Sequence, residues 1–270
     1  MPIMSSSNRP TPLLRAAAFA TLCLVAGTVA AAPASASSAA PSAAEDAGTT
    51  AIFRPVFATP QGAVEAGTAF VAKADRCKEP VLVTAMHLFG PGGGLKDAMD
   101  PDDLRHGVSR AELTGFGRGA KHMLFEVESL TPNEAQACCQ GQPMHGIGDV
   151  AAFTAPERLG SVALPLAGTP AVPGQHVTLL AEVLAPANAG LRHGAVVLGM
   201  HDGMLMYKFD DPTLELRATS GAPIVDETGK VVAINLMSGH MLKAEPRALV
   251  GGGNPVGSWR GAVEAQCRPR

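Results

Sequence analysis

Residues 218–235 read ATSGAPIVDETGKVVAIN, and this stretch indicates the class of fold. Two apolar runs flank the polar segment Asp226–Gly229, whose late glycine supplies the positive φ that a tight hairpin turn requires. The stretch therefore predicts a β-hairpin. Ser220 and Gly221 stand directly before it, and such a pair is common in turns, so Ser220 is either a nucleophile or a small turn residue. Partners elsewhere in the chain must decide between these two roles.

The rest of the chain repeats this pattern of short apolar or alternating runs, punctuated by Gly, Pro and Asp, without a sustained helical period. It predicts an all-β protein. The expected strands lie within residues 51–57, 67–74, 80–89, 122–130, 149–155, 161–168, 176–184, 194–209 and 222–236. A further hairpin turn is expected at 201–203, and surface loops are expected at 90–107 and 131–148. The Pro- and Gly-rich segment 158–174 indicates a crossover between two β-barrels, residues 51–155 and 156–270, the second ending in a short C-terminal segment.

The first 36 residues have the layout of a secretory signal peptide. Arg9 and Arg15 precede an apolar run over about residues 16–32, and small residues end at Ala36. A single membrane anchor is the alternative, but the run is short and rich in Ala and Gly. Residues 37–50 are small and polar, which predicts a disordered lead. We expect an exported protein, periplasmic or extracellular, that does not contact the membrane after signal removal.

Charge and cysteine content exclude some functions. The formal net charge is −3, and loss of the leader, which has two arginines and no acidic residue, makes it −5, so no basic footprint for nucleic acid exists. Four cysteines remain, and an even number suggests disulfides in an exported chain. Because Cys138 and Cys139 cannot easily pair with each other, we expect them to bond outward to Cys77 and Cys267. A zinc site at Cys138, Cys139 and His145 lacks CxxC spacing, so we expect no metal and no cofactor.

A catalytic serine needs an imidazole within hydrogen-bond reach and a carboxylate that holds this imidazole. His87 ends the apolar strand of VLVTAMHLFG, and Asp149 directly precedes another strand in GDVAAF. A carboxylate at the start of a buried strand needs a polar partner. A triad of His87, Asp149 and Ser220 is therefore the working hypothesis.

Three blocks in this order resemble the signature blocks of the trypsin/chymotrypsin-like serine peptidases, especially their bacterial secreted branch. They are GTAFVAKADRCKEPVLVTAMHLF at 67–89, GDVAAF at 148–153 and TSGAPIVDETGKVVAIN at 219–235. The resemblance covers about residues 51–260. It implies two six-stranded antiparallel β-barrels with the active site between them, a protein or peptide substrate, acyl-enzyme chemistry without a cofactor, and a monomer.

The resemblance also implies roles for individual residues. Ser220 would be the nucleophile, His87 the general base and later acid, and Asp149 the residue that orients His87. The backbone N–H groups of Ala218 and Ser220 would form the oxyanion hole. The residues implied to bind substrate are Leu214 at the base of the pocket and the edge-strand residues Asn235, Leu236, Met237 and Ser238.

Some positions depart from the family pattern. Ala218 stands where most relatives have glycine, and its Cβ opposes the backbone orientation that aims an N–H into the oxyanion hole. Thr219 replaces an Asp or Asn, which argues against activation by a new N-terminus. Met86 replaces the second alanine of the common Thr-Ala-Ala-His. A catalytically inactive homologue that acts as a binding module is therefore the alternative function.

Specificity follows from few residues. Leu214 offers no carboxylate for an Arg or Lys side chain, so an apolar or small side chain before the scissile bond is expected. A shift of one position in the alignment with the family would place Glu215 at the base of the pocket and reverse this inference. His240, near the presumed pocket, offers another alternative, a preference for acidic side chains in the substrate. An esterase of the α/β-hydrolase class is disfavoured because the serine comes last and no helix follows. The other histidines are expected to be structural or solvated: 106, 122, 145, 176, 193 and 201.

Overall fold

The computed structural model describes residues 51–116, 120–138, 143–186, 189–240 and 248–267. The predicted signal peptide and disordered lead lie outside these residues. Within the described part of the chain, no helix is long and apolar enough to cross a membrane.

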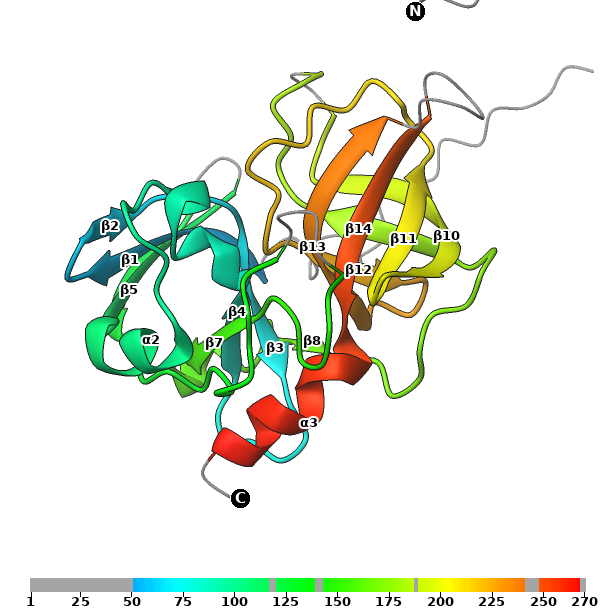
Figure 1. Ribbon diagram of the computed structural model, residues 1–270. Helices are drawn as coiled ribbons and strands as arrows, with labels where there is room; N and C mark the ends of the chain where they lie inside the picture. Colours follow the sequence, from blue (N-terminus) through cyan, green and yellow to red (C-terminus); the bar gives the residue numbers. More distant parts are fainter. Residues whose placement is uncertain (1–50, 117–119, 139–142, 187–188, 241–247, 268–270) are drawn as a thin grey trace, which may run out of the picture. The chain divides into compact units, whose positions relative to one another are not determined.

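The N-terminal half is a sheet in the order β6-β5-β1-β3-β4-β7, with β2 paired to β1 and β8 paired in parallel to β3 (Figure 1). Its strands are β1 (Ile52–Thr59), β2 (Gly62–Val64), β3 (Ala69–Lys73), β4 (Val81–Thr84), β5 (Arg110–Gly115), β6 (His122–Glu126), β7 (Ala151–Thr154) and β8 (Leu164–Pro165). The segment after β6 turns onto β7, since the Leu130 N–H donates to Ala152 O at 2.7 Å. The sheet is thus a barrel that this segment nearly closes.

The C-terminal half is a closed barrel of six strands in the order β10-β11-β14-β13-β12-β9. Its strands are β9 (His176–Leu180), β10 (Arg192–His201), β11 (Met204–Phe209), β12 (Pro223–Asp226), β13 (Val231–His240) and β14 (Leu249–Pro255). Both hairpin turns predicted from the sequence are confirmed, with φ of 48° at Asp202, 81° at Gly203 and 79° at Gly229. The two-barrel prediction holds, with one barrel closed and the other open between β6 and β7.

Burial explains why these residues form strands. In β9 and β10, buried and solvent-facing residues alternate, which is the pattern of a sheet with one face on the core. In the N-terminal half, Phe57, Phe89 and Phe153 pack together with ring centroids 5.0–5.7 Å apart. Phe89 directly follows the short 3-10 helix η1 (Met86–Leu88), so this aromatic cluster anchors the turn that carries His87.

The prediction that residues 90–107 are a solvated loop was wrong. They contain the 3-10 helix η2 (Pro91–Gly93) and the α-helix α2 (Pro101–Gly107). The Asp100 side chain accepts from the N–H groups of Asp102 and Asp103, and the Asp103 side chain accepts from the Asp100 N–H. This reciprocal capping specifies a seven-residue helix that no apolar period announces. A third 3-10 helix, η3 (Glu157–Leu159), lies in the crossover.

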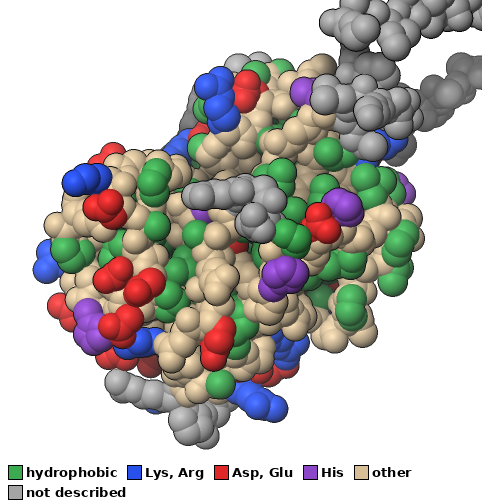
Figure 2. Space-filling model, viewed as in Figure 1, with side chains coloured by type: hydrophobic (Ala, Val, Ile, Leu, Met, Phe, Trp, Pro, Cys, Tyr) green, Lys and Arg blue, Asp and Glu red, His purple; other side chains and the backbone are tan. Residues whose placement is uncertain are grey.

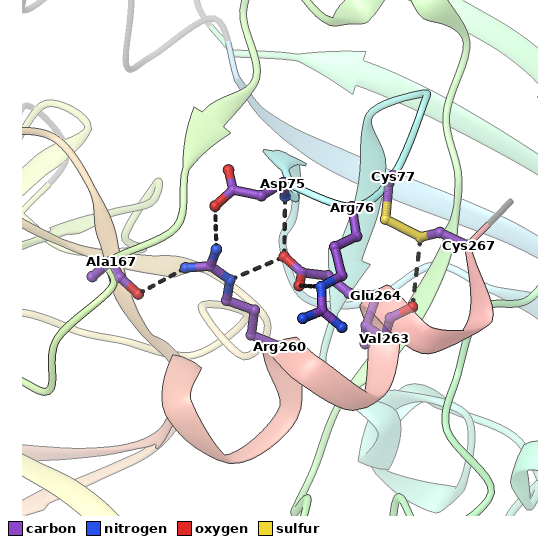
Figure 3. Close-up of polar contacts among 8 residues, drawn as sticks. All are labelled: Asp75, Arg76, Cys77, Ala167, Arg260, Val263, Glu264 and Cys267. Atoms are coloured by element: carbon purple, nitrogen blue, oxygen red, sulfur yellow. Dashed lines mark hydrogen bonds and ion pairs between the residues drawn. A yellow bond between two sulfur atoms is a disulfide. The ribbon is translucent and has the colours of Figure 1, made fainter. Parts of the chain in front are cut away.

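The described part of the chain ends in another α-helix that the sequence analysis also missed, α3 (Val256–Gln266). It continues from β14 of the C-terminal barrel and contacts the β3–β4 turn of the N-terminal barrel (Figure 3). Glu264 accepts hydrogen bonds from the Asp75 N–H and from Arg260 Nε, both at 3.0 Å, and Arg260 also pairs with the Asp75 carboxylate. The helix therefore links the two barrels.

A disulfide completes this link. Cys77 bonds to Cys267, with the two Cα atoms 5.1 Å apart, so the predicted pairing of both residues with Cys138 and Cys139 was wrong. The reason is tertiary, because α3 returns the C-terminal end of the chain to the β3–β4 turn. Cys138 is also disulfide-bonded, and Cys139 lies outside the described residues.

Candidate active site

His87 and Asp149 lie together, as the sequence predicted. His87 sits in η1, directly after β4, and Asp149 precedes β7, which pairs with β4. His87 Nδ1 is 2.7 Å from Asp149 Oδ2, and the His87 backbone N–H donates to Asp149 Oδ1 at 3.0 Å. Because a carboxylate oxygen accepts, Nδ1 is the donor in this contact, which leaves Nε2 as the ring nitrogen that can accept a proton from a serine.

Asp149 is completely buried, and its surroundings satisfy it. In addition to the two donors of His87, the Cys138 N–H donates to Oδ2 at 2.9 Å. Burial of a carboxylate is costly unless donors surround it, and three donors from two different segments meet this need. No sequence pattern announces the Cys138 contact, because every residue other than proline carries a backbone N–H donor.

The turn of Ser220 packs against the strand end that leads to His87. Gly221 has φ of 86°, and a Cβ at this position would lie 2.2 Å from Thr68 O and 3.0 Å from Ala85 N. Only a glycine fits there, both for its φ and for this close approach. The same close packing brings Ser220 next to the β4–η1 junction.

The carbonyl groups of Ala218, Thr219 and Ser220 accept hydrogen bonds from other groups of the protein. Thr68, in the N-terminal barrel, donates its hydroxyl to Ala218 O at 3.2 Å and its N–H to Ser220 O at 2.8 Å. Thr219 O accepts from Asn235 Nδ2 at 3.1 Å and from the Ala222 N–H at 3.0 Å. In the hydrogen bonds of the described residues, the N–H groups of Ala218 and Ser220 are not donors.

Ala218 adopts the backbone conformation that a glycine would favour. Its φ is 66°, in the left-handed region, so the Cβ does not prevent the orientation that we expected it to oppose. For a residue with a Cβ this conformation costs roughly 1–2 kcal/mol. The hydrogen bond from Thr68 to Ala218 O helps to hold it.

The Ser220 hydroxyl donates to Leu236 O at 3.1 Å. In the hydrogen bonds of the described residues, none joins Ser220 Oγ to His87. The structure therefore brings the serine, the histidine and the aspartate to one region, with the hydroxyl turned toward β13 rather than toward the imidazole.

The residues that were predicted to bind substrate differ in exposure. Leu214 is buried, and Glu215 pairs with Arg217 at the surface, with Arg217 Nε 2.9 Å from Glu215 Oε1. This contact with Glu215 raises the pKa of Arg217. The Glu215 carboxylate is thus engaged outside the barrel.

Along β13, Leu236 is buried, whereas Met237 and Ser238 are exposed and available to an extended ligand. The Asn235 side chain is 1% exposed and turned into the barrel. His240, at the end of β13, is exposed. Its proposed role and the binding roles of these four residues stay predictions.

Met86, the residue before His87, is buried and borders a pocket of about 740 Å³. The other residues that line this pocket include Met99, Arg105 of α2 and Asn133. Arg105 connects α2 to the segment of Asn133, because it donates to Asn133 Oδ1 at 2.6 Å and, within the helix, to Asp102 Oδ1 at 3.0 Å. Open space therefore borders the residue that precedes His87.

Figure 2 shows charged side chains of both signs on the N-terminal barrel and more apolar side chains on the C-terminal barrel. The exposed large apolar residues of the C-terminal half are Val172, Leu184, Leu198, Met200 and Met237. Among the described residues, no group of three or more His, Cys, Asp or Glu side chains could hold a metal ion.

Solved structures share this architecture. The thermostable serine protease AL20 from an extremophilic microorganism is similar, with a TM-score of 0.51 at 16% identity over 82% of this chain and 98% of that chain. The chain has the chymotrypsin-type fold. The active form of the Rv3671c protease of M. tuberculosis matches with a TM-score of 0.49 at 18% identity, over 84% of this chain and 85% of that chain. The serine endoprotease of Yersinia pestis also gives 0.49, at 13% identity, over 84% of this chain and 67% of that chain.

No protein-family model and no curated protein matches the sequence. This chain therefore resembles the AL20 protease in the arrangement of its strands and not in extended sequence identity. Sequence reasoning missed Thr68, which donates to the Ser220 turn, and Tyr207, which donates to Asn235. It named Asn235 only as a substrate-binding residue and missed its contact with Thr219. The available signal was that Thr68 and Asn235 lie within the family-like blocks at 67–89 and 219–235.

Proposed function

We propose that this protein is a serine endopeptidase that cleaves peptide bonds through an acyl-enzyme, with Ser220, His87 and Asp149 as its triad. The observation that carries the proposal is the imidazole of His87, fixed through Nδ1 and its own backbone N–H by the buried Asp149. A fixed neutral imidazole with a free acceptor nitrogen is what activation of a serine requires. The fold and the packing of the Ser220 turn against the His87 turn support it.

In the reaction, rotation about the Cα–Cβ bond of Ser220 takes the hydroxyl from Leu236 O to His87 Nε2. The imidazole then accepts the proton as Oγ attacks the substrate carbonyl, and Asp149 stabilises the resulting imidazolium. The imidazolium returns its proton to the leaving amine, and water hydrolyses the acyl-enzyme by the reverse sequence. The N–H groups of Ala218 and Ser220 stabilise the oxyanion of each tetrahedral intermediate.

The substrate is a protein or peptide that lies extended along β13 beside Met237 and Ser238, beyond Ile234, the last residue of β13 that pairs with β12. An added strand gains main-chain hydrogen bonds from such an edge. We propose a preference for an apolar or small side chain before the scissile bond, because Leu214 is apolar and the Glu215 carboxylate is paired with Arg217.

The enzyme acts outside the cytoplasm as a monomer. The predicted signal peptide supports export, and the Cys77–Cys267 disulfide fits an oxidising compartment. The protein needs no cofactor for this chemistry.

The test is reaction of the purified protein with a fluorophosphonate, followed by mass-spectrometric mapping of the modified peptide. We expect an adduct on Ser220, no adduct in His87→Ala, and an unchanged adduct in His106→Ala, whose ring lies on the surface against Asp102. Asp149→Asn should slow the reaction by roughly four orders of magnitude because it favours the wrong tautomer of the imidazole. A folded wild-type protein without an adduct would refute the proposal and favour a binding module.

A further inference from the structure

Asn235 connects the Ser220 turn to the interior of the C-terminal barrel. Its side chain is 1% exposed, and Nδ2 donates to Thr219 O at 3.1 Å and to Thr219 Oγ1 at 2.9 Å. On the opposite side, Oδ1 accepts from the hydroxyl of Tyr207, the only tyrosine of the chain, which is completely buried. A continuous buried path thus runs from Tyr207 through Asn235 to the residue before the serine.

The chemistry of these groups allows one orientation of the Asn235 amide. A backbone carbonyl such as Thr219 O only accepts, so the NH2 group of the amide must face it. The carbonyl oxygen of the amide then faces Tyr207, whose hydroxyl must donate. Burial raises the pKa of Tyr207, which keeps this hydroxyl protonated and able to donate.

The held carbonyl determines where the Ser220 N–H points. Thr219 C=O and Ser220 N–H belong to one trans peptide plane, in which the two groups point in opposite directions. Fixing Thr219 O toward Asn235 therefore aims the Ser220 N–H away from the barrel interior. This N–H is not a donor in the hydrogen bonds of the described residues, and it remains available to a ligand.

We infer that Asn235 is a positioning residue that aims the Ser220 N–H of the oxyanion hole, and that Tyr207 fixes the orientation of its amide. The inference rests on the proposed function. It also accounts for Thr219 at a position where relatives have Asp or Asn, because the Thr219 carbonyl and hydroxyl accept from the Asn235 amide, which folding alone puts in place. The turn is then set without chain cleavage.

The test measures the rate of fluorophosphonate reaction with Ser220 over a range of probe concentrations, which separates the maximal rate from the half-saturating concentration. Asn235→Ala should lower the maximal rate about tenfold and leave the half-saturating concentration unchanged. The loss is smaller than the roughly 100-fold to 1000-fold reported for complete removal of one oxyanion donor, because the Ala222 N–H still holds Thr219 O. Tyr207→Phe removes only the hydroxyl and should lower the maximal rate severalfold.

Thr131→Val is the matched control. Thr131 is buried in the N-terminal half, where its hydroxyl bridges the N–H and the carbonyl of Ala152 and does not contact the Ser220 turn. This variant should unfold at a lower temperature and react at the wild-type maximal rate.

The outcomes separate the two proposals. A wild-type protein that does not react refutes the proposed function. A reactive wild type, with Asn235→Ala folded and equally fast, overturns the role of Asn235 and leaves the proposed function standing. If Asn235→Ala does not fold, Tyr207→Phe decides, since a wild-type maximal rate in that variant overturns the inference.

Discussion

Removal of the Cys77–Cys267 disulfide, by serine at both positions, should lower the free energy of unfolding by about 5 kcal/mol. The two residues are 190 positions apart in the sequence, so the bond closes a loop that contains most of both barrels. In the chain-entropy relation, a loop of this length restricts the denatured chain by about 5 kcal/mol at room temperature. The effect lies almost entirely in the denatured state.

The native state should change little, because polar contacts also hold α3 on the N-terminal barrel (Figure 3). Glu264 is buried and accepts from the Asp75 N–H and from Arg260, and neither contact involves the disulfide. The double serine variant should therefore keep its reaction at Ser220 while it loses stability. As a matched control, Asp75→Asn weakens only the exposed ion pair with Arg260 and leaves the Arg260–Glu264 contact in place, so it should cost at most about 1 kcal/mol.

The assay is urea unfolding followed by the fluorescence of Trp259, the only tryptophan, which is buried in α3. The variant should unfold at lower urea with a steeper dependence on urea, because its denatured chain is less compact and exposes more surface. A loss below about 2 kcal/mol, the low end for native disulfides, would refute the loop-entropy reasoning. Equal slopes in the two proteins would refute it independently.

Two further predictions concern single residues. Ala218→Gly should leave the unfolding free energy within about 1 kcal/mol of the wild type, because relief of the left-handed φ offsets the added freedom of glycine in the unfolded chain. The control is Ala111→Gly, in a buried strand, which should be clearly destabilising. An equal loss of stability at both sites would contradict the strain argument. Burial lowers the pKa of His193 below 6.5. This effect outweighs the hydrogen bond to Ala181 O and the Asp211 carboxylate, which both raise the pKa. The unfolded chain therefore binds a proton that the native His193 does not, so stability falls as the pH drops below about 6.5. His193→Gln keeps a donor for Ala181 O and should weaken this dependence in urea titrations at about pH 7.5 and about pH 5.5, whereas an identical dependence in the variant would exclude His193 as its source.

Local patterns were sufficient for the hairpins of the C-terminal barrel. Gly203 and Gly229 mark turns that need positive φ, and alternating runs on either side mark strands with one buried face. Both signals act over a few residues, so they survive in a single sequence.

Elements without a local signal were missed. β14 contains Gly251, Gly252 and Gly253, a composition that disfavours strands. Packing favours glycine at position 251, because the ring of Tyr207 lies 2.3 Å from where a Cβ would stand. In α3, Gly257 and Gly261 lower helix propensity, and packing of Trp259 and Val263 against the core compensates for this.

The sequence by itself determined the all-β class, because short apolar runs between turn residues are a local signal. The proximity of His87 to Asp149 followed from the resemblance of three sequence blocks to the serine peptidases. Only the tertiary structure decided the disulfide pairing of Cys77, since covalent partners depend on where distant segments meet. It also decided that Asn235 points into the barrel toward Thr219, because a strand residue shows its face only once the register and the bulge between Asn235 and Met237 are fixed.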